Sequence, residues 1–292
     1  MKSVSNFTRL LLLATVTLIT SASMATETRV LRDIEYARAP EQALLLDLYL
    51  PEKTATPPLL IYVHGGAWRS GTKTDVPIEP LLKKGFAIAS VEYRLTPVAP
   101  FPANIHDLKA SIRFLRAKAT EYGYDPKRFI IVGSSAGGHL AALVGVSNGH
   151  KELEGKLGEF TNQSSDVQAI VSLYGASNLQ TILKQSSSRG LEVRVPALQL
   201  LLGGQPDEKP ELAKLASPVA HVDKNDPQLL LIHGDQDPQM PIQQSYELQE
   251  AYEKLKLPVQ FEVIHGGVHG GVEFYDEKRM RLVAEFLRKH LK

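Results

Sequence analysis

Short hydrophobic runs recur along the chain, and segments with a different apolar spacing lie between them. Five runs are almost continuously apolar, at 59–63, 86–91, 129–132, 169–174 and 229–232. A strand inside a parallel sheet is covered on both faces, so its sequence is apolar throughout. These runs therefore predict the strands of a buried, mostly parallel sheet.

The segments between the runs have the periodicity of amphipathic helices. One apolar stripe recurs every three or four residues, through Ile105, Leu108, Ile112 and Leu115. Two more stripes have similar spacing: Leu248, Ala251 and Leu255, and then Met280, Val283, Leu287 and Leu291. Alternating strands and helices indicate crossover units, with helices on both faces of the sheet.

Two regions depart from this alternation. At 46–50, leucines alternate with Asp47 and Tyr49, which predicts a half-exposed strand in an antiparallel start to the sheet. Between the runs that end at 174 and begin at 229, the chain has apolar pieces but no clear strand. We expect a small lid-like insertion near 178–225, over the carboxyl end of the sheet. An ordinary surface excursion is the alternative.

The N-terminal segment has the features of a secretory signal peptide. Lys2 and Arg9 give a positive start, 10–19 is almost wholly apolar, and 23–25 fits the small-x-small cleavage pattern. A membrane anchor needs about 20 apolar residues, more than this segment supplies. We therefore expect a signal peptide at 1–25, a secreted or periplasmic protein, and no membrane span after its removal.

The remaining residues, 26–292, are predicted to form a single α/β domain. Lys and Arg number 33 and Asp and Glu 32, for a net charge of +1, so no basic field exists to hold nucleic acid. The chain has no cysteine, which excludes disulfides, a thiol nucleophile and cysteine-ligated metal. No feature of the sequence indicates the oligomeric state.

A Gly-x-Ser-x-Gly motif at 133–137 identifies a candidate nucleophile, Ser135. The apolar run at 129–132 precedes it and a helical pattern follows at once, which is the strand–turn–helix context of a nucleophile elbow. The serine needs a strained turn, and its neighbours must be small for strand and helix to pass closely. Ser134 is in the wrong register for this turn.

The run at 59–63 ends in a glycine loop, His64 to Trp68, that is typical of an oxyanion hole. Backbone N–H groups of Gly66 and Ala67, together with that of Ala136, are the predicted donors, and Gly65 is the reserve. A simple glycine turn that holds Trp68 in the core is the alternative. His64 is predicted to orient the loop by a hydrogen bond.

Two carboxylates compete for the acid that orients the catalytic base. Both follow the run at 229–232, where α/β-hydrolases carry this residue. Asp237 lies further around the loop and is preferred. Asp235 is expected to satisfy local backbone N–H groups as a turn residue.

Two histidines compete for the base, His265 and His269, after a last strand at 259–264. His269 is preferred because its position on the glycine-rich loop lets it reach both Ser135 and Asp237. A neutral imidazole can take the serine proton near neutral pH. Metal binding by the two histidines is disfavoured, because Gly266 and Gly267 oppose the helix that their spacing requires. No cofactor is implied.

These motifs together resemble the hormone-sensitive-lipase-like esterases, and more closely the bacterial bifunctional feruloyl and acetyl-xylan esterases. Four segments carry the resemblance: His64 to Trp68, Tyr93 to Leu95 with Phe101 to Ala103, Gly133 to Gly138, and His233 to Pro241. The resemblance implies an α/β-hydrolase fold and cofactor-free hydrolysis of carboxylic esters, with a small-molecule or polysaccharide ester as the partner. It leaves the acyl group open.

Three departures favour the feruloyl/xylan-esterase branch. Ser134 stands where hormone-sensitive-lipase relatives usually have Asp, and Ala67 replaces their third loop glycine. Residues 26–58 are too few for their large N-terminal cap.

An amidase resembling kynurenine formamidase shares the His-Gly-Gly-x-Trp loop, but the signal peptide argues against it. A secreted peptidase of the prolyl-oligopeptidase group is a second rival, but such enzymes usually have an aromatic residue where Ala136 stands. A non-catalytic binding protein on the same fold is a third rival, but it would not need candidates at all three triad positions.

Overall fold

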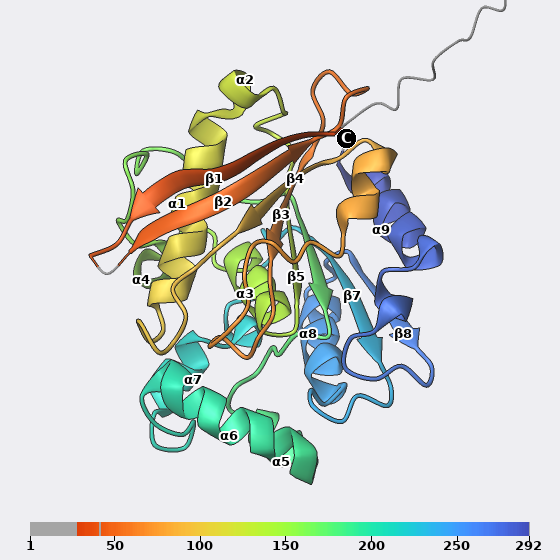
Figure 1. Cartoon of the computed structure of the whole chain (residues 1–292). Coiled ribbons are helices and arrows are strands. Elements are labelled where there is room, and N and C mark those ends of the chain that lie inside the picture. The colour runs from red at the N-terminus through yellow and green to blue at the C-terminus, as the bar shows by residue number, and fades with distance from the viewer. Residues whose placement is uncertain (1–27, 41, 292) are drawn as a thin grey trace, which may run out of the picture.

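In the computed structural model, which describes residues 28–40 and 42–291, eight strands form one sheet (Figure 1). Their order is β1-β2-β4-β3-β5-β6-β7-β8, and every pair from β4 to β8 is parallel. β2 pairs antiparallel with both of its neighbours. The strands are β1 (Arg29–Arg38), β2 (Ala43–Leu50), β3 (Leu59–Val63), β4 (Ala87–Val91), β5 (Phe129–Ser134), β6 (Ala169–Leu173), β7 (Gln228–Gly234) and β8 (Val259–Ile264).

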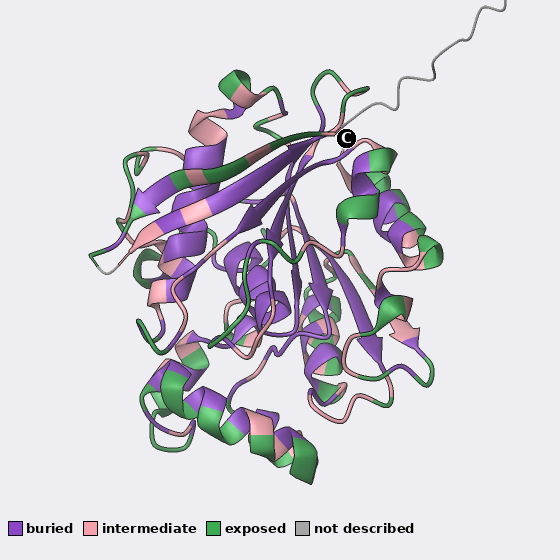
Figure 2. Cartoon of the chain, in the orientation of Figure 1, coloured by how far each residue is buried: buried purple, intermediate pink, exposed green. Residues whose placement is uncertain are grey.

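The five apolar runs are the five strands from β3 to β7, as predicted. Alternate side chains of each strand enter different apolar clusters, because successive side chains of a strand point to opposite faces. In β3, Leu59, Ile61 and Val63 join one cluster, whereas Leu60 and Tyr62 join the other. Both faces of the strands from β3 to β7 are therefore covered (Figure 2).

Helices cover the two faces as the apolar stripes predict. Residues of α1, α3 and α8 pack into the first cluster, and residues of η1 and α9 pack into the second. These elements are α1 (Ala103–Ala117), α3 (Ala136–Gly145), α8 (Gln243–Lys254), η1 (Glu79–Lys84) and α9 (Glu277–His290). The shorter ones are α2 (Ala119–Tyr122), α4 (Lys151–Glu154) and η3 (Val272–Phe274). The predicted α/β-hydrolase fold, with helices on both faces of a mostly parallel sheet, is confirmed.

The strand predicted at 46–50 is present as the antiparallel strand β2, but the prediction that it is half exposed is wrong. Asp47 is fully buried and Tyr49 is 6% exposed. The Asp47 carboxylate accepts from Arg32 on β1 at 2.9 Å and pairs with Lys73 from the loop after β3 at 2.8 Å. Its charge is compensated by residues far away in the sequence, so local alternation could not predict the burial.

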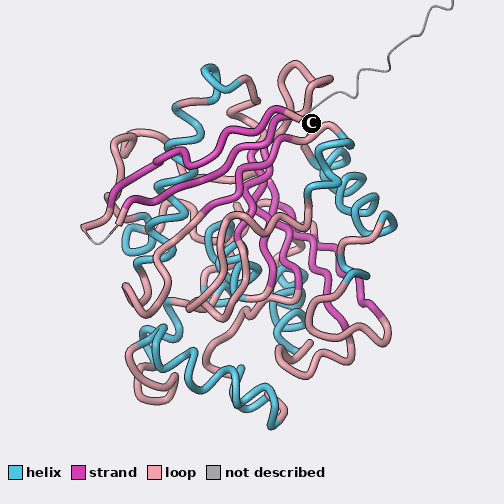
Figure 3. Tube along the Cα trace, in the orientation of Figure 1, coloured by secondary structure: helices cyan, strands magenta, loops and turns pink. Residues whose placement is uncertain are grey.

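The insertion at 178–225 consists of α5 (Ile182–Gln185), α6 (Ser188–Leu202), α7 (Pro210–Leu215) and η2 (Pro218–Ala220). α5, α6 and α7 run across the end of the sheet toward which β5 and β7 point (Figure 1), and the segment is helix and loop (Figure 3). Ser187 anchors α6 because its Oγ accepts from Gly190 N–H and donates to the carbonyl oxygen of Pro238. The insertion therefore has the expected place.

In the N-terminal part of the chain, the described residues among 28–58 contribute β1 and β2 to the sheet and form no cap. The predicted signal peptide at 1–25 lies outside the described residues. Among the residues that the structure describes, no helix is both long enough and apolar enough to cross a membrane.

Candidate active site

Ser135 occupies a strained turn between β5 and α3. Its backbone has φ 54° and ψ −118°, a region that a non-glycine residue rarely adopts. The neighbouring glycines are required by close packing. A Cβ on Gly133 would lie 2.1 Å from the carbonyl oxygen of Gly137, and one on Gly137 would lie 2.0 Å from that of Val63. The motif therefore forms the predicted elbow.

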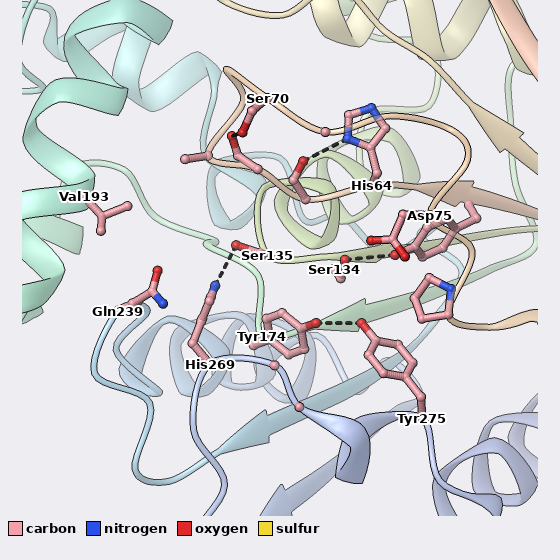
Figure 4. A pocket seen from close by; sticks show the side chains of 18 of the residues that line it. His64, Ser70, Asp75, Ser134, Ser135, Tyr174, Val193, Gln239, His269 and Tyr275 are labelled. Carbon is pink, nitrogen blue, oxygen red and sulfur yellow. Dashed lines mark hydrogen bonds between the residues drawn. The ribbon is translucent and has the colours of Figure 1, made fainter.

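The structure brings the three preferred residues into one hydrogen-bonded chain. Ser135 Oγ lies 2.8 Å from His269 Nε2 (Figure 4), and His269 Nδ1 lies 2.6 Å from Asp237 Oδ2. Ser135 follows β5, Asp237 follows β7 and His269 follows β8. Because these strands are parallel, their carboxyl ends meet at one edge of the sheet. This is the geometry of a Ser–His–Asp triad.

The Asp237 carboxylate is fully buried and held as an anion. Burial by itself raises its pKa, but hydrogen bonds from His233 and His269 and from the Met240 amide hold that pKa well below its usual range. Oδ1 accepts from the amides of Gln239 and Met240, both at 2.8 Å. An ionised Asp237 keeps the His269 proton on Nδ1 and leaves Nε2 free to accept from Ser135. His233 was not identified from the sequence, because nothing local distinguishes it.

The competing acid and base bind one another instead. His265 Nδ1 lies 2.8 Å from Asp235 Oδ2, and the His265 side chain is 87% exposed. The hydrogen bond from His265 lowers the pKa of Asp235, as does that from the Gly266 amide. This surface pair joins the loop that carries Asp237 to the loop that carries His269.

The oxyanion-loop candidates lie beside Ser135. Gly66 and Ala67 line the same cavity as Ser135, and Ala136 is the buried first residue of α3. Ala67 has φ 51°, a left-handed conformation that is unusual for a residue with a Cβ. The reserve candidate, Gly65, packs against the strand end, where a Cβ would lie 3.0 Å from the carbonyl oxygen of Ser134. The three amides remain the predicted donors.

His139 anchors this loop and was not identified from the sequence. Trp68 is fully buried, and its Nε1 donates to His139 Nδ1 at 3.0 Å. His139 Nε2 in turn lies 2.6 Å from the carbonyl oxygen of Ala216, so the imidazole is neutral with its proton on Nε2. His64 has the structural place predicted for it: its Nδ1 lies 2.8 Å from the carbonyl oxygen of Gly65, and its ring stacks on Tyr93.

A cavity of about 1240 Å³ opens around Ser135 and His269. Tyr174 and Tyr275 form one side, with their hydroxyl oxygens 2.6 Å apart, and Val193 and Gln239 lie on the other side (Figure 4). The Tyr174 ring meets His269 edge-on, with centroids 4.9 Å apart. The site therefore offers room for a substrate much larger than an acetyl group. Within the described part of the chain, no three His, Asp or Glu residues are grouped to hold a metal ion.

This fold and this site define the class of α/β-hydrolases that use a serine nucleophile. The chain belongs to the BD-FAE family, whose model matches residues 46–252. It is 32% identical over 223 residues to Esterase LipC of Mycobacterium tuberculosis, covering 73% of this chain and 53% of LipC. It is 28% identical over 256 residues to isoprenylcysteine alpha-carbonyl methylesterase ICME of Arabidopsis thaliana, covering 86% of this chain and 59% of that protein. The chain spans about half the length of the curated relatives it matches.

Solved structures share nearly the whole fold. A truncated carbohydrate esterase from gut microbiota superposes with a TM-score of 0.82 and 32% identity, covering 90% of this chain and 96% of the other. An acetyl ester-xyloside bifunctional hydrolase from Caldicellulosiruptor lactoaceticus has a TM-score of 0.73 and 23% identity, covering 88% and 95%. The second likeness concerns the fold alone.

Proposed function

We propose that the protein hydrolyses carboxylic esters through an acyl-enzyme on Ser135. The observation that carries the proposal is the continuous hydrogen-bonded chain from Ser135 through His269 to a buried, ionised Asp237. Such a chain has one chemical use at the mouth of a cavity, which is to make the serine hydroxyl a nucleophile.

In the first step, His269 Nε2 takes the Ser135 proton while Oγ forms a bond to the ester carbonyl carbon. The carbonyl oxygen becomes an oxyanion, which the amides of Gly66, Ala67 and Ala136 stabilise by hydrogen bonds. His269 then donates its proton to the alkoxide as the carbon–oxygen bond breaks, and the alcohol leaves. Water, deprotonated by His269, attacks the acyl-enzyme, and collapse of that intermediate releases the acid and restores Ser135.

Acetyl or feruloyl esters of plant polysaccharide, or similar small esters, are the proposed substrates. Three observations support them: membership of the BD-FAE family, likeness to a carbohydrate esterase over nearly its whole length, and a cavity large enough for an aromatic acyl group or a sugar. The segment 1–25 supports export of the enzyme to the periplasm or medium, where such polymers occur. Cell fractionation with N-terminal sequencing of the mature protein tests the export.

The test of function is a kcat/KM panel on the purified protein. It contains 4-nitrophenyl acetate, methyl ferulate, acetylated xylan, N-formylkynurenine and a peptide anilide, each with the Ser135→Ala variant as control. We expect turnover of esters, abolished in the variant, and no comparable turnover of the two amides. Preference for either amide would replace the proposal with an amidase or a peptidase, and full ester turnover by Ser135→Ala would refute the assigned nucleophile.

A further inference from the structure

A buried arginine without a matching anion lies in the wall of the candidate active site. Arg194 projects from α6 of the insertion, is 1% exposed and lines the same cavity as Ser135. Its Nη1 is buried and has no hydrogen-bond partner among the described residues. Its Nε donates over a long 3.4 Å to the carbonyl oxygen of Gln239. The guanidinium therefore retains hydrogen-bonding capacity in the wall of the cavity that Ser135 also lines.

Burying a guanidinium whose Nη1 has no hydrogen-bond partner is energetically unfavourable. Burial lowers the pKa of Arg194 to about 10, which still leaves the guanidinium charged at neutral pH. The carboxylate whose field acts on it most is Asp237, but hydrogen bonds from His269 and from backbone amides already engage both Asp237 oxygens. No carboxylate among the described residues forms an ion pair with Arg194. A buried, unpaired charge is normally avoided or used to bind a ligand.

A second cation lines the same cavity. Arg69 immediately follows Trp68 on the oxyanion loop, is exposed, and is close enough for its charge to lower the Arg194 pKa. The guanidinium of Arg194 itself lies 5.9 Å from the centre of the Trp68 ring. The two arginines thus approach the cavity from different segments of the chain.

Three acidic residues of the described chain line the cavity: Asp75, Glu273 and Asp276. In Figure 4, Val193 and Gln239 lie on one side of the Ser135–His269 pair, and Asp75 and Tyr275 lie on the other. Arg194 is adjacent to Val193 in α6 and contacts Gln239, so it belongs to the first side. Arg194 therefore lies on the side of the cavity that the insertion forms, across the Ser135–His269 pair from Asp75.

We infer that Arg194, assisted by Arg69, binds a carboxylate carried by the substrate, so that the enzyme acts preferentially on anionic esters. The inference rests on the proposed ester hydrolysis and specifies which esters the site selects. A carboxylate would complete the two-pronged hydrogen bonding that a guanidinium favours. It would also place the ester between this anchor and Ser135. An acidic sugar or a dicarboxylic acyl group are substrates of this chemistry.

The experiment compares pairs of closely matched esters, of which one member carries a carboxylate and the other is neutral. On the alcohol side, 4-acetoxybenzoate is compared with 4-acetoxybenzamide, and on the acyl side, mono(4-nitrophenyl) adipate is compared with its methyl ester. The quantity measured is the ratio of kcat/KM for the anionic member to that for the neutral member. It is measured in wild type, Arg194→Gln, Arg194→Lys and Arg189→Gln. Arg189 is an exposed arginine of the same helix, and its variant matches the loss of charge.

We expect wild type to prefer the anionic member of at least one pair. Arg194→Gln should lower that ratio by roughly tenfold to a hundredfold, as expected for a lost hydrogen bond to a charged group. Arg194→Lys should retain part of the preference, and Arg189→Gln should leave the ratio unchanged. Thermal unfolding of each variant shows whether it is folded.

Three results would overturn the inference. One is a wild type that prefers the neutral member of both pairs, which needs no variant to be folded. Another is an equal loss on both members in Arg194→Gln, which would make Arg194 a positioning residue for Trp68. The third is an equal fall of the ratio in Arg189→Gln, which would make the effect one of general charge. If wild type hydrolyses no ester at all, the proposed function itself fails, and that outcome is distinct from these.

Discussion

The indole N–H of Trp68 donates to Nδ1 of His139 over 3.0 Å, and this bond joins the oxyanion loop to the helix that begins after Ser135. Both side chains are fully buried. The bond therefore fixes two parts of the site relative to one another: the amides of Gly66 and Ala67, and the turn that holds the nucleophile.

Removing the donor should weaken the fold and the activity together. Trp68→Phe keeps an aromatic ring but leaves a buried ring nitrogen of His139 without its partner, which typically costs about 1–3 kcal/mol. We expect a loss of that size in the free energy of unfolding, measured in urea, and a lower kcat because the loop is less well positioned. Tyr246→Phe, which removes a hydroxyl from a side chain that is 48% exposed, is the control. An unchanged free energy of unfolding in Trp68→Phe would show that the bond does not stabilise the fold.

His139 should make the protein acid-sensitive in a defined pH window. Burial lowers its pKa to about 4, whereas an unfolded histidine titrates near 6.5. Between these values the unfolded chain binds a proton that the folded chain does not. The free energy of unfolding therefore falls as the pH drops from about 6.5 toward about 4, by at most about 1.4 kcal/mol per pH unit for one group.

The measurement is urea unfolding between these pH values for wild type and His139→Gln. The variant should show a shallower dependence because it lacks the His139 contribution. Some dependence should remain, because His64 and His221, whose pKa values burial also lowers, are present in both proteins. Asp237 contributes in a different window: the hydrogen bonds that lower its pKa stabilise the fold at neutral pH, and this is lost only below about pH 4. Parallel curves for the two proteins would contradict the role given to His139.

Substitutions of the two acidic residues in the loop after β7 should have very different effects on kcat. Asp237→Asn removes the charge that fixes the His269 tautomer, and we expect kcat to fall by about a thousandfold or more. Asp235→Asn weakens only the exposed pair with His265, so its kcat should stay within a few-fold of wild type. Steady-state assays on 4-nitrophenyl acetate check both. Similar losses of kcat in the two variants would contradict the assignment of Asp237 as the acid that orients His269.

A substitution in the oxyanion loop should stabilise the protein. Ala67 has φ 51°, and a residue with a Cβ in this region costs about 1–2 kcal/mol. Ala67→Gly removes that strain, but glycine also gains freedom in the unfolded chain. We expect a net stabilisation of up to about 1 kcal/mol, visible as a higher Tm. A lower Tm would mean that Cβ contacts outweigh the strain.

The elements that were predicted well are those whose signal lies in neighbouring residues. Strands β3 to β7 are buried on both faces, and continuous apolar runs record that directly. The turn at Ser135 needs glycine two positions away on each side, so its motif is local too. The strand β2 was misjudged for the opposite reason, because Asp47 is covered by Arg32 and Lys73 from other segments.

The residues that sequence reasoning missed owe their roles to three-dimensional contacts. His139 contacts Trp68, which lies 71 residues away in the sequence, and His233 becomes notable only because its imidazole lies 3.3 Å from the Asp237 carboxylate. Arg194 was not singled out in the sequence, and the structure places it, buried, in the cavity wall. None of these contacts leaves a periodic or motif-based signal.

By itself the sequence determined the strands β3 to β8, the strained serine turn, the glycine loop and a choice of two acids and two bases. Only the tertiary structure decided that His269 pairs with Asp237 beside Ser135, while His265 pairs with Asp235 at the surface. The reason is physical: a hydrogen bond requires its atoms to lie within about 3 Å. Which atoms meet that condition depends on how the loops after β7 and β8 fold against one another.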